Sequence, residues 1–290
     1  MAGSADMQGI KRRIKSVTSI EHITNAMKLV SAAKLRRAKT VFERTQEHFH
    51  YVSHRINELF NNVMDIPSKY LEGSREIKKT CYVIITSNRG LAGSFNSSVI
   101  REAEKEINAG TGEHVLACIG SKGRDYFARR GHEIVAEHMA PPEDTRFEEV
   151  KDIITPIVRL YDREEIDEII LISTIFISSL EQRVHKDRLL PFKVEINPEL
   201  EPLDREIDYE PSAEVVFNYL IPKYVEIMIF GAIIESATCE HAARRIAMEN
   251  ATENARNMME DLNLFYNRAR QAAITSEITE IVSGADAINN

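Results

Sequence analysis

A turn with two glycines is the first place where this sequence could do chemistry. Residues 87–94, SNRGLAGS, connect a predicted strand to a predicted helix, and backbone amides at such a junction often hold phosphate groups. Gly90 and Gly93 have GxxG spacing, which is neither the GxGxxG of dinucleotide sites nor the Gly-Lys pair of a Walker A loop. This weak match favours a tight strand-to-helix connection. A nucleotide- or phosphate-binding module that uses Gly90 and Gly93 is the alternative.

The other candidates for catalysis or metal binding are incomplete. His132 and Glu133 begin like the HExxH motif of zinc proteases, but Ala136 stands where the second histidine belongs. His50 and His54 are four residues apart without a cysteine or carboxylate beside them, which favours a solvated helix face. We therefore expect no catalytic residue, no bound cofactor and no metal site.

The composition of the 290 residues is that of a globular protein, with 43% hydrophobic and 28% charged residues. The net charge of −8 argues against a nucleic-acid binder. The basic runs at 11–15 and 34–39 therefore indicate a solvated helix face or a strip that faces an acidic protein partner. No run approaches the roughly 18 apolar residues of a membrane span.

Residues 1–65 are expected to form one long N-terminal helix. No proline and no glycine occur between Gly9 and residue 63, and apolar residues recur every three or four positions. The pattern has an interruption near residues 31–35. The predicted seam consists of Ile10, Ile14, Val17, Ile20, Ile23, Met27, Val30, Leu35, Ala38, Val41 or Phe42, Phe49, Val52, Ile56, Leu59 and Val63.

Residues 66–210 are interpreted as a globular base domain of the α/β class. The predicted strands are 81–86, 114–119, 133–137 and 168–176, and residues 182–191 and 192–196 read as strands or extended chain. The predicted helices are 96–108, 124–130 and 147–161. This alternation favours a largely parallel, Rossmann-like sheet.

Residues 211–290 predict a second long helix, with Pro211 in its first turn and a possible kink at Pro222. Its small seam residues suit close helix packing, and its acidic excess complements the basic excess of residues 1–60. Each seam needs a partner, and the other long helix of the same chain is the simplest one. We therefore expect a long antiparallel coiled coil joined through the α/β base. The apolar residues near the C-terminal end, Ile278, Ile281, Val282 and Ile288, need a covering partner.

Four segments carry a resemblance to a known family. They are IKRRIKSVTSIEHITNAMKLVSAAKLRRA, SNRGLAGSFN, ESATCEHAARRIAMENATENA and LNLFYNRARQAAITSEITEIVSGADAI. In these segments the chain resembles the gamma subunit family of the F-type ATP synthase, and is most similar to bacterial forms.

The resemblance implies a non-catalytic rotor in the central stalk. Such a subunit couples ion-driven rotation of the membrane c-ring to conformational changes at the catalytic sites of the beta subunits, and works in reverse during ATP hydrolysis. The implied partners are one ring of alpha and beta subunits, the epsilon subunit and the c-ring, with no nucleic acid and no membrane contact except through the c-ring. The implied location is the cytoplasmic face of the bacterial plasma membrane. A static coiled-coil scaffold is a further alternative.

The resemblance also implies two sets of contact residues. The positions matching contacts with the alpha/beta ring are Met27, Lys28, Arg244, Arg268, Arg270, Gln271, Thr275 and Glu277. The positions matching contacts with epsilon and the c-ring are Ile207, Asp208, Tyr209 and Glu210.

Overall fold

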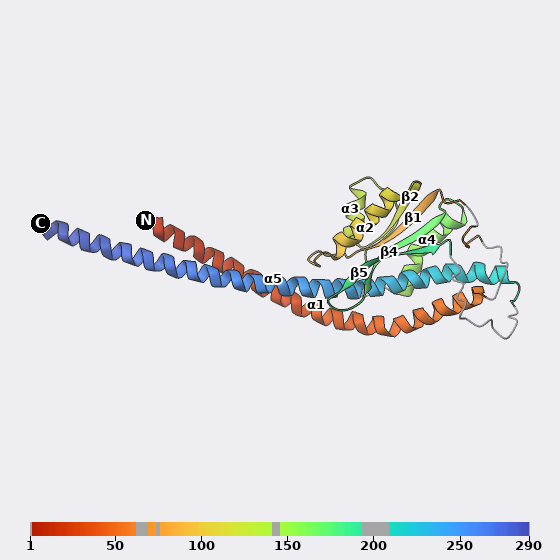
Figure 1. Ribbon diagram of the computed structural model, residues 1–290, viewed down its shortest axis with the longest axis horizontal. Helices are drawn as coiled ribbons and strands as arrows, with labels where there is room; N and C mark the ends of the chain where they lie inside the picture. The colour runs from red at the N-terminus through yellow and green to blue at the C-terminus, as the bar shows by residue number, and fades with distance from the viewer. Residues whose placement is uncertain (1, 62–68, 74–75, 141–145, 193–208, 290) are drawn as a thin grey trace. The chain divides into compact units, whose positions relative to one another are not determined.

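The computed structural model describes residues 2–61, 69–73, 76–140, 146–192 and 209–289. Its elements, in chain order, are α1 (Ala2–Asn61), β1 (Lys79–Ile85), α2 (Phe95–Ala109), β2 (Glu113–Ile119), α3 (Ser121–Ala128), β3 (Ile134–His138), α4 (Phe147–Asp162), β4 (Glu168–Phe176), β5 (Gln182–Leu190) and α5 (Ala213–Asn289) (Figure 1). The chain divides into two compact units. One combines Met1–Ser31 with Arg245–Asn290, and the other is Ala32–Arg244.

The described strands of the second unit form one sheet with the order β3-β2-β1-β4-β5. The pairs β1–β2, β1–β4 and β2–β3 are parallel, and β5 runs antiparallel to β4. Runs such as CYVII in β1 and IILI in β4 are apolar without alternation, as is usual for strands that are covered on both faces. The predicted α/β fold with a largely parallel sheet is confirmed.

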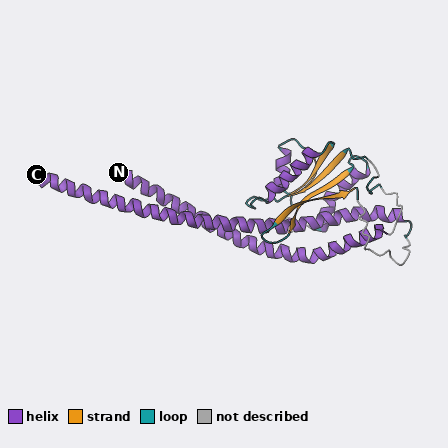
Figure 2. Ribbon diagram, in the orientation of Figure 1, coloured by secondary structure: helices purple, strands orange, loops and turns teal. Residues whose placement is uncertain are grey.

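Helices cover both faces of this sheet (Figure 2). Cys81, Val83 and Ile85 of β1 share a core with α4 and with the first part of α5. The alternate β1 residues, Tyr82 and Ile84, share a second core with α2 and with Phe127 of α3. Because successive strand residues point to opposite faces, β1 lies at the centre of both cores.

The first part of α5 is a core helix of the α/β unit. Its buried residues follow one another at intervals of four and have no exposed surface: Phe217, Ile221, Val225, Ile229 and Ile233. By length and composition α5 has a stretch apolar enough to cross a membrane, so the expectation that no run approaches a membrane span is wrong. The core helix of a globular protein meets the same criteria, and 39% of this stretch is buried.

The first unit contains an antiparallel pair of helical segments. Thr18, Glu21 and Thr24 of α1 contact Met259, Arg256 and Thr252 of α5, so the positions rise along one helix as they fall along the other. The predicted antiparallel pairing is therefore confirmed in this unit. On α5 the more buried positions repeat in steps of four and three, at 248, 252, 255, 259, 262, 266, 269 and 273.

The predicted α1 seam is wrong between residues 20 and 30. Ile20, Ile23 and Val30 are 49%, 59% and 57% exposed, whereas the buried positions are the polar residues Glu21, Thr24 and Ser31. The buried heptad steps run from 17 to 42 without the predicted interruption. From Leu35 onward the apolar positions of the pattern coincide with the buried positions, at Leu35, Ala38 and Phe42. The predicted interruption marks the point where this coincidence begins.

The division into parts 1–65, 66–210 and 211–290 stays a prediction. The boundary between residues 65 and 66 lies outside the described residues, and α5 begins at Ala213. The compact units place the inner halves of both long helices with the α/β layers.

Candidate functional site

The seam of the first unit is held by polar contacts. The hydroxyls of Thr24 and Thr252 are 2.9 Å apart, and both side chains are buried. Arg256 donates from Nε and Nη2 to the same oxygen of Glu21, at 3.0 and 2.9 Å. Polar pairs of this kind fix the register of a coiled coil, because a slip would leave each buried group without its partner.

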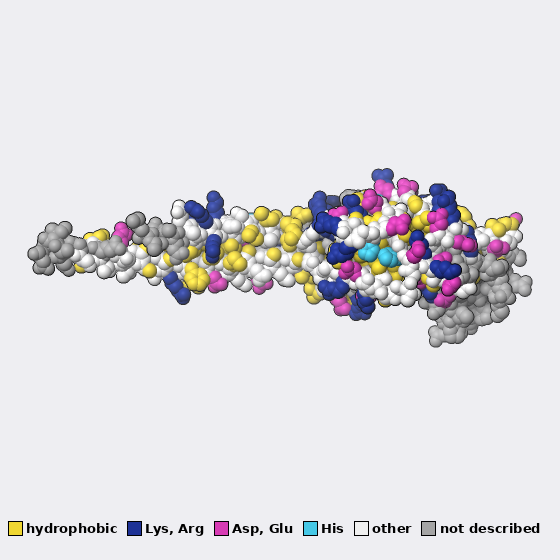
Figure 3. All heavy atoms as spheres, turned by 90° about the horizontal axis from the view of Figure 1, so that it is seen from above, with side chains coloured by type: hydrophobic (Ala, Val, Ile, Leu, Met, Phe, Trp, Pro, Cys, Tyr) yellow, Lys and Arg dark blue, Asp and Glu magenta, His cyan; other side chains and the backbone are white. Residues whose placement is uncertain are grey.

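An apolar strip lies on α1 beside this seam. Ile20, Ile23 and Val30 form the strip, and Leu29 adjoins it with 63% exposure. Figure 3 shows apolar side chains of this kind at the surface of the helices. Met27 and Lys28, both predicted ring contacts, are half-buried at the edge of the strip. An exposed apolar strip on a helix indicates a surface that a partner covers.

The predicted ring contacts on the last part of α5 are all exposed. They are Arg268, Arg270, Gln271, Thr275 and Glu277. The Thr275 hydroxyl donates to the backbone carbonyl of Gln271 at 2.9 Å. Exposed apolar residues share this segment, including Ile274, Ile278, Ile281 and Val282. Mixed polar and apolar exposure suits an interface, and the contacts themselves stay predictions.

Part of the turn at 86–94 is hydrogen-bonded internally. The Ser87 amide donates to Oδ1 of Asn96 at 2.9 Å, and the Ser121 amide donates to Oδ1 of Asn88 at 2.9 Å. The Gly123 amide donates to Oγ1 of Thr86 at 2.9 Å. These bonds use one amide of the turn and two amides at the start of α3, so these three donors already have partners.

Arg244 is placed against this turn. Its Nη2 donates to the carbonyls of Arg89 and Gly90 at 3.1 and 3.2 Å, and its Nε lies 3.3 Å from the Gly90 carbonyl. Nη1 pairs with Glu240 at 2.7 Å, and the Arg244 side chain is 9% exposed. Its predicted contact with a ring therefore stays a prediction, while the structure shows an internal role that sequence reasoning missed. The i, i+4 spacing of Glu240 and Arg244 was the available signal.

The crevice at the carboxyl ends of β1 and β4 is filled by the chain itself. The strand order reverses between these two strands, which is where ligands bind in open α/β sheets. Here Ala92 and Phe95 pack with Cys239 of α5 in a small core, and Phe176 lies against it. The nucleotide-binding alternative is not favoured.

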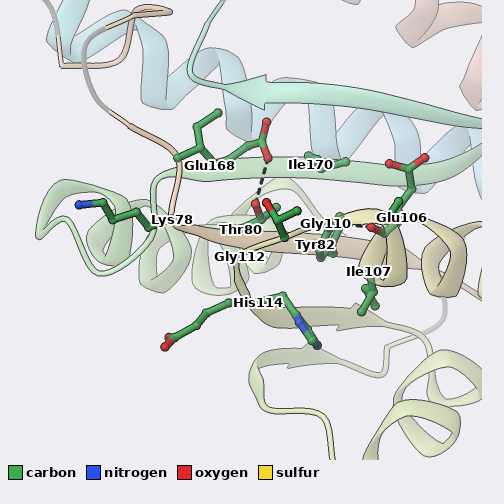
Figure 4. Close-up of a pocket in the computed structure, with 14 residues that line it drawn as sticks. Lys78, Thr80, Tyr82, Glu106, Ile107, Gly110, Gly112, His114, Glu168 and Ile170 are labelled. Atoms are coloured by element: carbon green, nitrogen blue, oxygen red, sulfur yellow. Dashed lines mark hydrogen bonds between the residues drawn. The ribbon is translucent and has the colours of Figure 1, made fainter.

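A cleft of about 360 Å³ lies at the opposite end of the sheet (Figure 4). Thr80 donates to Glu168 at 2.9 Å, and the Tyr82 hydroxyl lies 3.4 Å from the Glu106 carbonyl. His114 shares a 2.9 Å hydrogen bond with His132. Burial, and secondarily the charge of His132, lowers the pKa of His114. No predicted site residue lines this cleft. Among the described residues, no three His, Cys, Asp or Glu side chains could hold a metal ion.

The predicted epsilon and c-ring contacts are only partly described. Ile207 and Asp208 lie outside the described residues. The Tyr209 ring lies 5.6 Å from the ring of Phe217, and burial raises the pKa of Tyr209. Glu210 is exposed.

Comparisons with known proteins agree with this architecture. The family described as ATP synthase matches residues 6–288. The ATP synthase gamma chain of Alkaliphilus metalliredigens is 43% identical over 286 residues, covering 97% of this chain and 98% of that one. The gamma chain of Moorella thermoacetica is 40% identical over 284 residues, covering 98% and 99%.

Solved structures show the same fold at lower identity. A chain of the mitochondrial ATP synthase of Euglena gracilis aligns with a TM-score of 0.73 at 17% identity, covering 98% of this chain and 95% of that one. A central stalk/c-ring structure from Tetrahymena thermophila contains a chain that aligns with a TM-score of 0.61 at 24% identity, covering 79% and 99%. With near full-length relatives of about two-fifths identity and a shared fold, this chain belongs to the ATP synthase gamma chain family.

Proposed function

We propose that this chain is the rotor subunit of an ATP synthase central stalk. It couples ion-driven rotation of the membrane c-ring to conformational changes at the catalytic sites of the beta subunits, and works in reverse during ATP hydrolysis. Family membership supports the proposal, and the observation that carries it is the antiparallel helix pair. That pair has a polar, register-fixing seam and leaves apolar and basic surface exposed.

The mechanism follows from the asymmetry of the helix pair. One side of α1 offers the apolar strip of Ile20, Ile23 and Val30, whereas the last part of α5 offers Arg268 and Arg270. In a ring of repeated subunits, each rotational position presents a different surface to each catalytic site. Differential contact shifts each site among its conformations, and this coupling is reciprocal. Rotation can therefore drive synthesis, and hydrolysis can drive rotation.

The proposed partners are one ring of alpha and beta subunits, the epsilon subunit and the c-ring. Met27, Lys28, Arg268, Arg270, Gln271, Thr275 and Glu277 would contact the ring, and the exposed positions of this set support that assignment. Tyr209 and Glu210, which precede α5, would contact epsilon or the c-ring. The subunit would be a peripheral part of the membrane-bound complex, on the cytoplasmic face of the bacterial plasma membrane.

The proposed subunit has no catalytic group of its own. The Ser87 amide of the turn and the Ser121 and Gly123 amides of α3 are bonded internally, and the crevice between β1 and β4 is filled. These contacts support coupling over nucleotide chemistry. A static scaffold would bind the same partners but would transmit no torque.

Co-expression of this chain with alpha and beta subunits from the same source tests the proposal. Native mass spectrometry should show one copy of the chain per ring, and a bead fixed to the chain should rotate when ATP is added. A monodisperse chain that never joins the ring would contradict the proposal. A ring that hydrolyses ATP around an immobile chain would support the scaffold.

A further inference from the structure

Arg244 is the last residue of a row of α5 side chains that make hydrogen bonds to β4 and to the turn after β1. The Phe176 amide donates to Glu235 at 2.8 Å, and the Thr174 amide lies 3.4 Å from the Ser236 hydroxyl. The Cys239 thiol lies 3.5 Å from the Thr174 carbonyl. We call Glu235, Ser236, Cys239, Glu240 and Arg244 the α5 latch. The latch therefore bonds to the end of β4 and to the turn that follows β1.

The Arg244 end of the latch is the most directional part. One guanidinium reaches the carbonyls of both Arg89 and Gly90, and Glu240 holds it from the preceding turn of α5. Arg244 and Glu240 have 8% and 6% of their surface exposed. Charge-assisted hydrogen bonds to fixed carbonyls depend on geometry, so a sideways shift of α5 would lengthen them.

The turn that Arg244 grips is itself tied to the rest of the layer. Asn88 donates to the Met139 carbonyl beyond β3 at 2.8 Å and accepts from the Ser121 amide at the start of α3. Ser87 is bonded to Asn96 of α2. A force applied to the Arg89 and Gly90 carbonyls therefore reaches β1, α2, α3 and β3 together.

The apolar contacts beside the latch offer less resistance to sliding. Ala92 and Ala243 are small, and burial of apolar surface has no preferred direction along the interface. Resistance to a tangential force must therefore come mainly from directional bonds and from interlocked side chains. The Arg244 contacts supply directional bonds at this end of the sheet.

We propose that Arg244, held by Glu240, is a positioning residue that transmits torque between α5 and the α/β layer. The inference rests on the proposed rotor function. It assigns Arg244 an internal task in coupling, in place of a direct contact with the catalytic ring. Without the latch, α5 would shift relative to the α/β layer when torque is applied. Part of each rotational step would then not be transmitted.

The decisive measurement is the ratio of ATP-driven ion transport to ATP hydrolysis. Complete ATP synthase carrying Arg244→Gln is reconstituted into vesicles and assayed while the opposing ion-motive force is raised. Arg245→Gln is the matched control, because Arg245 pairs with Glu249 at the same i, i+4 spacing but on the surface. A ratio is used because a loss of folded complexes lowers transport and hydrolysis equally.

The latch predicts that the ratio for Arg244→Gln falls by about twofold or more as the load rises, since each lost charged hydrogen bond shifts an equilibrium by about tenfold or more. Arg245→Gln should follow the wild type at every load. Equal ratios for the two variants would overturn the proposal. If Arg244→Gln does not assemble, Arg244→Lys and Glu240→Gln take its place, because Lys cannot bridge two carbonyls as a fork. Wild-type ratios in both would likewise overturn it.

Hydrogen exchange separates the latch from a ring contact. In the isolated full-length chain, Arg244→Gln should raise the exchange rate of the amides in turn 86–94 by about tenfold, because the turn loses its tether. An unchanged exchange rate of these amides would rule out the internal role of Arg244. Failure of the wild-type complex to transport ions would instead count against the rotor function, and the exchange result would still decide the contact.

Discussion

Thr24 and Thr252 lie 228 positions apart, yet a 2.9 Å hydrogen bond joins their hydroxyls inside the seam of α1 and α5. Each hydroxyl also lies close to a carbonyl of its own helix, at 3.1 Å from Glu21 for Thr24 and 2.7 Å from Met248 for Thr252. Both side chains are therefore satisfied although they are buried. The pair sets the register of the two helices, since a slip would separate the hydroxyls.

Thr252→Val should lower the free energy of unfolding by about 1–2 kcal/mol, because it removes the cross-helix bond inside the seam. Urea unfolding of the full-length chain measures this change. Thr279→Val, at an exposed position of α5, is the control and should stay within about 0.5 kcal/mol of the wild type. The double variant Thr24→Val with Thr252→Val should lose less than the sum of the single losses. Strict additivity would show that the bond contributes nothing.

Gly231→Ala should destabilise the α/β unit by about 1–3 kcal/mol through overpacking. A Cβ at this position would lie 2.9 Å from Cδ2 and Cε2 of Phe49, so the ring must move. Gly9→Ala is the matched control, since nothing lies within 4 Å of its added Cβ. That variant should gain up to about 1 kcal/mol from helix propensity. Calorimetry on both variants gives opposite shifts in Tm, and a gain for Gly231→Ala would contradict the packing.

The His114–His132 pair should make stability fall in weak acid. The pKa of His114 is lowered in the folded chain, first by burial and then by the charge of His132. The unfolded chain therefore binds more protons between that lowered pKa and about 6.5, so stability is present above about 6.5 and is lost as the pH falls through this window.

The acid sensitivity can be checked residue by residue. In His132→Gln the pKa of His114, measured by NMR titration, should move towards its ordinary value, because the repelling positive charge of His132 is gone. The unfolding free energy of His114→Gln should fall less between pH 7 and pH 5 than that of the wild type. An unchanged His114 titration in His132→Gln would mean that the two imidazoles do not interact.

Arg270→Ala with Gln271→Ala should impair coupling by about threefold or more in the assembled complex, since a few residues usually dominate an interface. Both positions are exposed on α5, so the loss should not come from stability. Glu260→Ala with Asp261→Ala, a neighbouring exposed pair on the same helix, is the control. Wild-type ATPase activity and coupling in the first variant would refute the site assignment and favour a static scaffold.

The elements of the α/β layers could be predicted closely from the sequence. The β4 bounds of Glu168–Phe176 were predicted without error, α4 is one residue longer at its end, and α2 is one residue longer at each end. These segments carry continuous apolar runs or regular amphipathic periods, and local pattern is a reliable guide where both faces or one face are buried. The helix predicted over 124–130 begins earlier, at Ser121, because Gly120 at φ +95° starts the turn of α3 there.

The orientation of α1 could not be predicted in the same way. Apolar periodicity selected Ile20, Ile23 and Val30, but the structure buries Glu21, Thr24 and Ser31 next to them. Periodicity finds an apolar face without saying what covers that face. Here α5 packs against the polar face, and the apolar face stays exposed.

The elements, the α/β class and the long terminal helices could be predicted from the sequence, because they depend on neighbours within a few residues. The family could be predicted as well, since the similarity extends along nearly the whole chain. The face of α1 that meets α5 and the contacts of Arg244 became visible in the folded structure alone. Those choices depend on contacts between residues as far apart as Arg244 and Gly90, 154 positions along the chain, whose pairing no local pattern encodes.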